Sequence, residues 1–160
     1  MHKIGIISDT HGMLRPEVAA VFAGVELIIH AGDVGALPVI MELNKIAPVT
    51  AVRGNTDKAL WSRELPASAV VTVGNLNLYV LHILAELDID PAAAELAAVV
   101  YGHSHQQMQE TLGGVLYFNP GSAGQPRYGL PASVGLITIE NSRISGEIIP
   151  LMETAAQRRA

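Results

Sequence analysis

The sequence predicts an α/β fold, an α/β/β/α sandwich of two mixed β-sheets with outer helices. In the first half, apolar strand-like runs alternate with helix-like segments at short spacing, which favours right-handed βαβ units and a parallel sheet. In the second half, strand-like runs flank turn residues, which favours antiparallel hairpins. The length of 160 residues suits a single domain over residues 1–160, with a polar C-terminal tail at about 153–160.

The first half is expected to hold three strands and two helices. The strands are β-branched runs that stop at polar or glycine residues. A proline lies in the first turn of each helix, where it is well tolerated. In chain order the elements are a strand at 3–8, a helix from Pro16 to about Phe22, a strand at 26–30, a helix at 37–45 and a strand at 49–52.

The second half is expected to be mostly strands. Gly74-Asn75 and Glu140-Asn141-Ser142 are turn signals that separate neighbouring strands. One short Ala-rich helix is expected at 91–96. The expected strands are 69–73, 76–81, 98–101, 115–118, 133–139 and 145–150.

Composition narrows the function classes. The chain has no cysteine, so a metal must be held by nitrogen and oxygen ligands. The net charge is −5 and only ten residues are Lys or Arg, so we expect a small substrate and no nucleic acid. No apolar run reaches the ~20 residues that span a bilayer, so we expect no membrane association. The first residues form no signal-peptide pattern, which makes the cytoplasm the expected location.

Polar side chains recur where the expected strands end. Because ligands bind at the carboxyl ends of strands in open α/β sheets, these side chains are candidates for one site. Residues two apart in an extended segment point the same way, so His103 and His105 can present paired ligands. Each residue alone has an ordinary explanation, such as a solvated turn or a core histidine, but the ordered set favours a site. Its members are Asp9, His11, Asp33, Asn55, His82, His103 and His105.

The same segments resemble those of the calcineurin-like metallophosphoesterases. The matching segments are Ser8-Asp9-Thr10-His11-Gly12, Gly32-Asp33, Gly54-Asn55-Thr56-Asp57, His82 and Gly102-His103-Ser104-His105. The compact length, with Asn119-Pro120-Gly121-Ser122 and Pro126-Arg127, is similar to the small single-domain prokaryotic branch, the YfcE-like phosphodiesterases. The resemblance runs from about residue 3 to about residue 149.

This resemblance implies a dinuclear metal centre with Asp33 as the bridging ligand. The first ion would be held by Asp9, His11, Asp33 and His105, and the second by Asp33, Asn55, His82 and His103. Mn²⁺ is favoured, and Ni²⁺, Co²⁺, Fe²⁺ and Zn²⁺ are alternatives. A metal-bridging hydroxide would attack the phosphorus of a small phosphoester directly. We expect Asp33 and Asn55 to be catalytic. A phosphodiesterase is favoured over a monoesterase, but the ligands leave this preference open because the pocket walls decide it.

Two departures from the family pattern bear on the mechanism. Many relatives have His after the Gly-Asn pair, and the small branch often has Cys, whereas this chain has Thr56. A Thr hydroxyl is a poor general acid, so the sequence does not say what protonates the leaving group, and acidic leaving groups such as aryl esters should be favoured. Ile83-Leu84 replace the Gly-rich stretch usual after His82.

Other residues have two interpretations each. Asp57 either orients catalytic neighbours through hydrogen bonds or is an exposed turn carboxylate. Arg127 either pairs with a substrate phosphate, together with Asn55, or is a surface arginine. Ser122 either contacts substrate or only stabilises its turn. His30 precedes Ala31-Gly32 on its strand and is expected to be buried rather than a ligand.

Two further hypotheses come from the same fold. One is a non-catalytic or weakly active metal-binding interaction scaffold, as in the eukaryotic retromer subunit, which would be expected to have lost ligands. The other is a nuclease, which the acidic balance of the chain disfavours. The sequence leaves open the physiological substrate and whether the chain forms a homo-oligomer.

Overall fold

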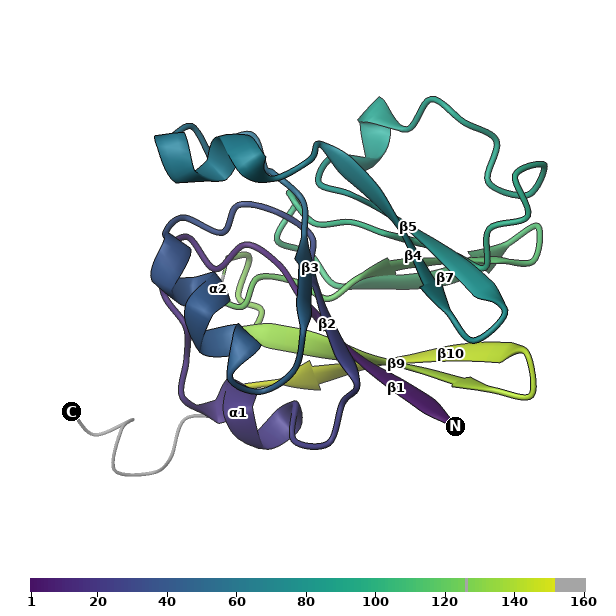
Figure 1. Cartoon of the computed structure of the whole chain (residues 1–160), viewed down its shortest axis with the longest axis horizontal. Helices are drawn as coiled ribbons and strands as arrows, with labels where there is room; N and C mark the ends of the chain where they lie inside the picture. The colour runs from purple at the N-terminus through teal and green to yellow at the C-terminus, as the bar shows by residue number, and fades with distance from the viewer. Residues whose placement is uncertain (126, 152–160) are drawn as a thin grey trace.

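The computed structural model describes residues 1–125 and 127–151 and has two five-stranded sheets (Figure 1). Pro126 and the expected tail at 153–160 lie outside the described residues. The first sheet has the order β10-β9-β1-β2-β3, with β1 (His2–Ile7), β2 (Leu27–His30), β3 (Val49–Ala51), β9 (Ser133–Glu140) and β10 (Arg143–Pro150). The second has the order β4-β5-β6-β8-β7, with β4 (Ser68–Val73), β5 (Leu76–Leu81), β6 (Ala98–Val100), β7 (Met108–Leu112) and β8 (Val115–Asn119).

Both sheets are mixed, as expected. In the first sheet β1, β2 and β3 are parallel, while β9 and β10 run antiparallel to their neighbours. In the second sheet β5, β6 and β8 are parallel, while β4 and β7 are antiparallel edge strands. β7 escapes sequence-based prediction because all five of its side chains are exposed, so it lacks the alternation that marks a half-buried strand.

Strand alternation builds two layers of core. Ile4 and Ile6 of β1 pack between the sheets against side chains such as Phe118 of β8. Ile7 and its neighbour Ile28 face the other way, toward the helices. α1 (Glu17–Val21) and α2 (Leu37–Asn44) cover that face, and they lie together beside the first sheet in Figure 1. The sandwich therefore buries both faces of the first sheet.

Within the described part of the chain, no α-helix covers the outer face of the second sheet. Leu84 in the 3-10 turn η2 (Leu84–Glu86) and Leu87 pack on the cluster that contains Val99 and Tyr101. A second 3-10 turn, η1 (Leu60–Glu64), precedes β4. Among residues 1–125 and 127–151, no helix is long and apolar enough to cross a membrane.

The prediction of a helix at 91–96 is wrong. Asp90 caps a single turn, because its side chain accepts from the N–H groups of Ala92 and Ala93. Glu95 then adopts a left-handed backbone (φ 58°), and the Leu96 N–H donates to the Pro91 carbonyl, which closes the turn as a Schellman motif. The Ala-rich composition favoured a helix, but this motif ends it after one turn.

Candidate metal centre

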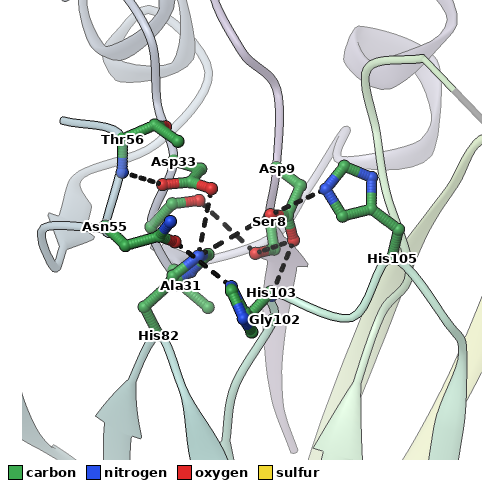
Figure 2. A network of polar contacts seen from close by, with 12 residues as sticks. Ser8, Asp9, Ala31, Asp33, Asn55, Thr56, His82, Gly102, His103 and His105 are labelled. Atoms are coloured by element: carbon green, nitrogen blue, oxygen red, sulfur yellow. Dashed lines mark hydrogen bonds and ion pairs between the residues drawn. The ribbon is translucent and has the colours of Figure 1, made fainter.

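The expected ligands converge where strands of both sheets end (Figure 2). Asp9 and His11 follow β1, and Asp33 follows β2. Asn55 follows β3 of the same sheet, and His82 directly follows β5 of the second sheet. The loop after β6 carries His103 and His105. The structure therefore brings together all seven residues that the sequence singled out.

The loops that carry these ligands are strained. Five ligands have a left-handed backbone, with φ of 56° at Asp9, 47° at His11, 55° at Asp33, 72° at His103 and 60° at His105. Such a conformation costs an ordinary residue of the order of 1–3 kcal/mol, and it persists only where the surrounding structure enforces it. Strain concentrated in this way is typical of a functional site.

Two glycines allow the loops to close on the carboxylates. A Cβ at Gly54 would lie 2.1 Å from Oδ1 of Asp33, and one at Gly102 would lie 2.7 Å from Oδ2 of Asp9. Both distances are shorter than real Cβ contacts allow. The backbone at these two glycines therefore lies directly against the carboxylates.

Each carboxylate has one anchored oxygen and one that faces the imidazoles. Oδ2 of Asp9 accepts from the Ser8 hydroxyl at 2.8 Å and from the His103 N–H at 3.1 Å. Its Oδ1 lies 3.4 Å from Nε2 of His105. Oδ1 of Asp33 accepts from the Thr56 N–H at 2.9 Å, while its Oδ2 faces His82. The anchoring bonds fix which oxygen each carboxylate presents.

His82 is held in one orientation at the middle of the cluster. Its Nδ1 lies 2.8 Å from the Ala31 carbonyl oxygen, which can only accept, so Nδ1 carries the hydrogen. Nε2 therefore faces Asp33 Oδ2 at 3.1 Å and Asp9 Oδ1 at 3.9 Å. A backbone carbonyl that fixes the tautomer in this way is typical of a metal-binding histidine. The unusual Ile83-Leu84 that follows does not displace His82 from the site.

The nitrogen and oxygen atoms form two overlapping groups that could each hold an ion. One group is Asp9, His11 and His105, and the other is Asp9, Asp33 and His82; within each group the ligand atoms lie within 4.8 Å of one another. Asp9 belongs to both groups. Oδ2 of Asp33 also lies between two histidines, 3.6 Å from Nε2 of His11 and 3.1 Å from Nε2 of His82. The bridging role of Asp33 stays a prediction.

Asn55 and His103 form the exposed rim of the site. Nδ1 of His103 lies 3.1 Å from Oδ1 of Asn55, and the His103 ring meets the His82 ring edge-on at 5.3 Å. Both residues are exposed, whereas Asp9 and His82 are buried. On the other side of the cluster, the rings of His11 and His105 stack at 5.3 Å.

Burial and charge act in opposite directions in this cluster. Burial raises the pKa of Asp9, and His82, Ser8 and His105 offset this only in part. Burial also acts to raise the pKa of Asp33, but the nearby His82 and the Thr56 N–H outweigh it and hold the pKa well below its usual range. Burial acts to lower the pKa of His82, yet Asp33 and Asp9 raise it. Burial therefore has the larger effect on the pKa of Asp9, whereas the neighbouring groups have the larger effect on the pKa values of Asp33 and His82.

The donor atoms fit divalent cations. Three buried side-chain atoms of the described ligands have no hydrogen-bond partner: Oδ1 of Asp9, Nε2 of His82 and Nδ1 of His105. A buried polar atom without a partner is costly, so such atoms usually have a function. Carboxylate and neutral imidazole ligands together suit Mn²⁺, Fe²⁺, Ni²⁺, Co²⁺ or Zn²⁺.

Two buried side chains behind the ligands tie their loops together. Asp57 is 4% exposed and accepts three backbone N–H bonds, from Val34, Gly35 and Gly54, so it is not an exposed turn carboxylate. These bonds join the loop of Asp33 to the loop of Asn55.

His30 is fully buried, as expected, and burial lowers its pKa to about 3, so the imidazole is neutral. The Gly32 N–H donates to Nδ1 of His30, whose Nε2 therefore donates to the Thr10 hydroxyl, which donates to the Val34 carbonyl. This chain of bonds holds Thr10, between Asp9 and His11, against the β2 loop.

The expected substrate-binding residues differ in their surroundings. Arg127 is exposed and lines a pocket of about 440 Å³ next to His11 and His105. Ser122 is buried, and its hydroxyl lies 3.2 Å from the Asp9 carbonyl oxygen and 3.1 Å from that of Gln125. Those contacts agree with the interpretation that Ser122 stabilises its turn. Met13 and Gln125, which also line the pocket, carry no signal in the sequence because separate loops bring them there.

Residues 2–142 match the calcineurin-like phosphoesterase superfamily domain, so the chain belongs to this superfamily. A probable metallophosphoesterase of Methanothermobacter thermautotrophicus is 35% identical over 158 residues, which cover 91% of this chain and 91% of that protein. The phosphodiesterase YfcE of Escherichia coli strain K12 is 34% identical over 161 residues, which cover 86% of this chain and 88% of that protein. The resemblance to the small YfcE-like branch is confirmed.

Solved structures show the same architecture. A structure described as a novel archaeal phosphodiesterase aligns with a TM-score of 0.76 and 28% identity, covering 92% of this chain and 99% of that chain. Vps29 of Chaetomium thermophilum aligns with a TM-score of 0.75 and 18% identity, covering 96% of this chain and 100% of that chain. The second likeness shows the fold alone.

Proposed function

We propose that this protein is a dinuclear metal-dependent phosphodiesterase that hydrolyses small phosphoesters. One observation carries the proposal: the unpartnered Oδ1 of Asp9 and Nε2 of His82 point into a buried cluster of two carboxylates and several imidazoles. The names of the relatives, which include a phosphodiesterase, support the same reaction class.

The residues that would hold the ions are those of the two groups, with Asn55 and His103 completing the second. Two divalent ions held there, Mn²⁺ by preference, would polarise the phosphoryl oxygens and acidify the water that attacks as hydroxide. Two carboxylates against two such ions leave a local formal charge of about +2, which attracts an anionic phosphoester to a chain of net charge −5.

The protein's own contribution is positioning. Ser8, Thr56 and the Ala31 carbonyl orient Asp9, Asp33 and His82, so each presents its ligand atom without rearrangement. Asp57 acts in catalysis indirectly, because its three backbone bonds set the spacing of the Asp33 and Asn55 loops.

The exposed groups act on the substrate. The Asn55 amide and the Arg127 guanidinium lie on opposite sides of the cluster and would contact the phosphoryl oxygens. Thr56 contacts the site through its backbone N–H, which donates to Oδ1 of Asp33. Because the Thr56 hydroxyl does not titrate in a useful range, substrates with acidic leaving groups are favoured.

The test is turnover of an aryl phosphodiester and of the corresponding monoester by metal-stripped protein reloaded with Mn²⁺, Ni²⁺, Co²⁺ or Mg²⁺. We expect metal-dependent hydrolysis, faster for the diester. Tight binding of metal with no turnover of either ester would refute the proposal and favour the interaction scaffold. Cleavage of single-stranded DNA at a comparable rate would instead favour a nuclease.

A further inference from the structure

A pocket of about 440 Å³ opens on the His11–His105 side of the metal centre. Asn55 and Thr56 lie on the opposite side of the cluster, where both are exposed (Figure 2). The pocket is lined by Thr10, His11, Met13, His105, Gln125 and Arg127.

The pocket is too large for a phosphoryl group alone. A phosphoryl group is about as large as three water molecules, roughly 90 Å³ at 30 Å³ each. The remaining space suits an organic group the size of a ring or a nucleoside. The total volume of the pocket lies within the ordinary range of small-molecule sites.

One wall of the pocket is fixed to the metal centre. The Gly124 N–H donates to the Asp9 carbonyl, and the Arg15 guanidinium donates twice to the Gly124 carbonyl. A Cβ at Gly124 would lie 2.7 Å from the Thr10 carbonyl oxygen, so the two loops are in direct contact. The Ser122 hydroxyl also contacts the Gln125 carbonyl. The wall that carries Gln125 is therefore preorganised.

The side chains on the pocket suit an aromatic ring. Met13 is 36% exposed and belongs to none of the hydrophobic clusters formed by the described residues, so the core does not explain it. A thioether makes favourable contacts with aromatic rings, and a guanidinium such as that of Arg127 stacks on their faces. The exposed amide of Gln125 can hydrogen-bond a polar group on the ring.

We propose that Met13 and Gln125 form a subsite for an aromatic ester arm, the one that stays on phosphorus during hydrolysis. The leaving arm departs on the opposite side of the cluster, near Asn55 and Thr56, which are both exposed. This inference rests on the proposed function, since it names the substrate class of the same site. A simple aryl group and a nucleobase present the same flat face, and the choice of substrates in the kinetic test distinguishes them.

The kinetic test keeps the leaving group constant. The substrates are bis(4-nitrophenyl) phosphate, methyl 4-nitrophenyl phosphate and thymidine 5′-(4-nitrophenyl phosphate), which all release 4-nitrophenolate. The Mn²⁺-loaded protein should have a higher kcat/KM for an aromatic retained arm than for methyl, and the preferred arm tells aryl from nucleobase. Met13→Ala and Gln125→Ala should each reduce that preference about fivefold to tenfold. Met41→Ala, at an exposed methionine on α2, should not change it.

A binding measurement separates the subsite from catalysis. Titration calorimetry with phenylphosphonate and methylphosphonate, whose carbon–phosphorus bonds do not hydrolyse, should show tighter binding of the phenyl compound, with the difference lost in Met13→Ala. The proposed subsite would be overturned if the preference for an aromatic over a methyl group were the same in the wild type, Met13→Ala and Gln125→Ala, both by kinetics and by calorimetry. If no phosphoester is hydrolysed but the calorimetric difference holds, the proposed function fails and the aromatic subsite stands.

Discussion

Gly54→Ala tests whether the close contact between two loops sets the catalytic geometry. The new Cβ would lie 2.1 Å from Oδ1 of Asp33 and 2.2 Å from its backbone nitrogen. Because real Cβ atoms essentially never come within 3.0 Å of a heavy atom outside their own residue and its chain neighbours, the loops must separate by at least about 0.8 Å. Rotation of the Asp33 side chain cannot relieve this, since the backbone nitrogen is also too close.

A displacement of about 1 Å at a catalytic centre costs roughly 100-fold in rate. We therefore expect kcat/KM of Gly54→Ala for bis(4-nitrophenyl) phosphate to fall about 100-fold with Mn²⁺ present. Gly24→Ala is the matched control, because a Cβ there meets nothing within 4 Å, although φ is +83°. It should lose about 1 kcal/mol of stability and keep its activity. A folded Gly54→Ala protein with more than half of the wild-type activity would show that the contact between these loops does not set the catalytic geometry.

Three further predictions concern a ligand, the leaving group and a buried histidine. Asp33→Ala should be the most damaging single change, because it should lower activity more than about 100-fold and also lower the metal content. Full activity of Asp33→Ala with Mn²⁺ would show that Asp33 does not bridge the two ions. Thr56→His should raise the turnover of alkyl phosphodiesters at least about tenfold while changing the turnover of aryl phosphodiesters little. If the turnover of alkyl esters stays at the wild-type value, the missing proton donor does not limit the reaction. His30 has a pKa of about 3 in the folded protein against 6.5 as its ordinary value, so only the unfolded chain takes up its proton as the pH falls below 6.5. Wild-type protein should therefore lose about 2 kcal/mol more stability than His30→Gln between about pH 8 and pH 5, and equal losses in urea titrations would contradict the neutral, buried state.

The sequence was sufficient to predict which polar residues come together because strand ends are local features. Each run of β-branched residues stops at its polar residue, and parallel strands bring those ends to one edge. Asp9, Asp33 and His82 therefore lie together as expected. The identity of the atoms that hold them could not be predicted, since the Ser8 hydroxyl and the Ala31 carbonyl act through orientation alone.

The features that the sequence did not predict correctly also have physical explanations. The Ala-rich segment at 91–96 has helical composition, but the left-handed Glu95 and the Asp90 cap close it after one turn. β7 is exposed along its whole length, so its pairing with β8 leaves no periodic pattern. The pocket that Met13 and Gln125 line depends on contact between loops more than 100 residues apart in the sequence, such as the hydrogen bond from the Gly124 N–H to the Asp9 carbonyl.

The number and position of the bound ions decide whether this site is a dinuclear metal centre. We propose anomalous diffraction from crystals grown with Mn²⁺ and collected above and below the manganese absorption edge. We expect two peaks about 3.5–4 Å apart, one near Asp9, His11 and His105 and one near Asp33 and His82. A single peak, or no peak at these residues in protein that hydrolyses the aryl diester, would contradict this expectation.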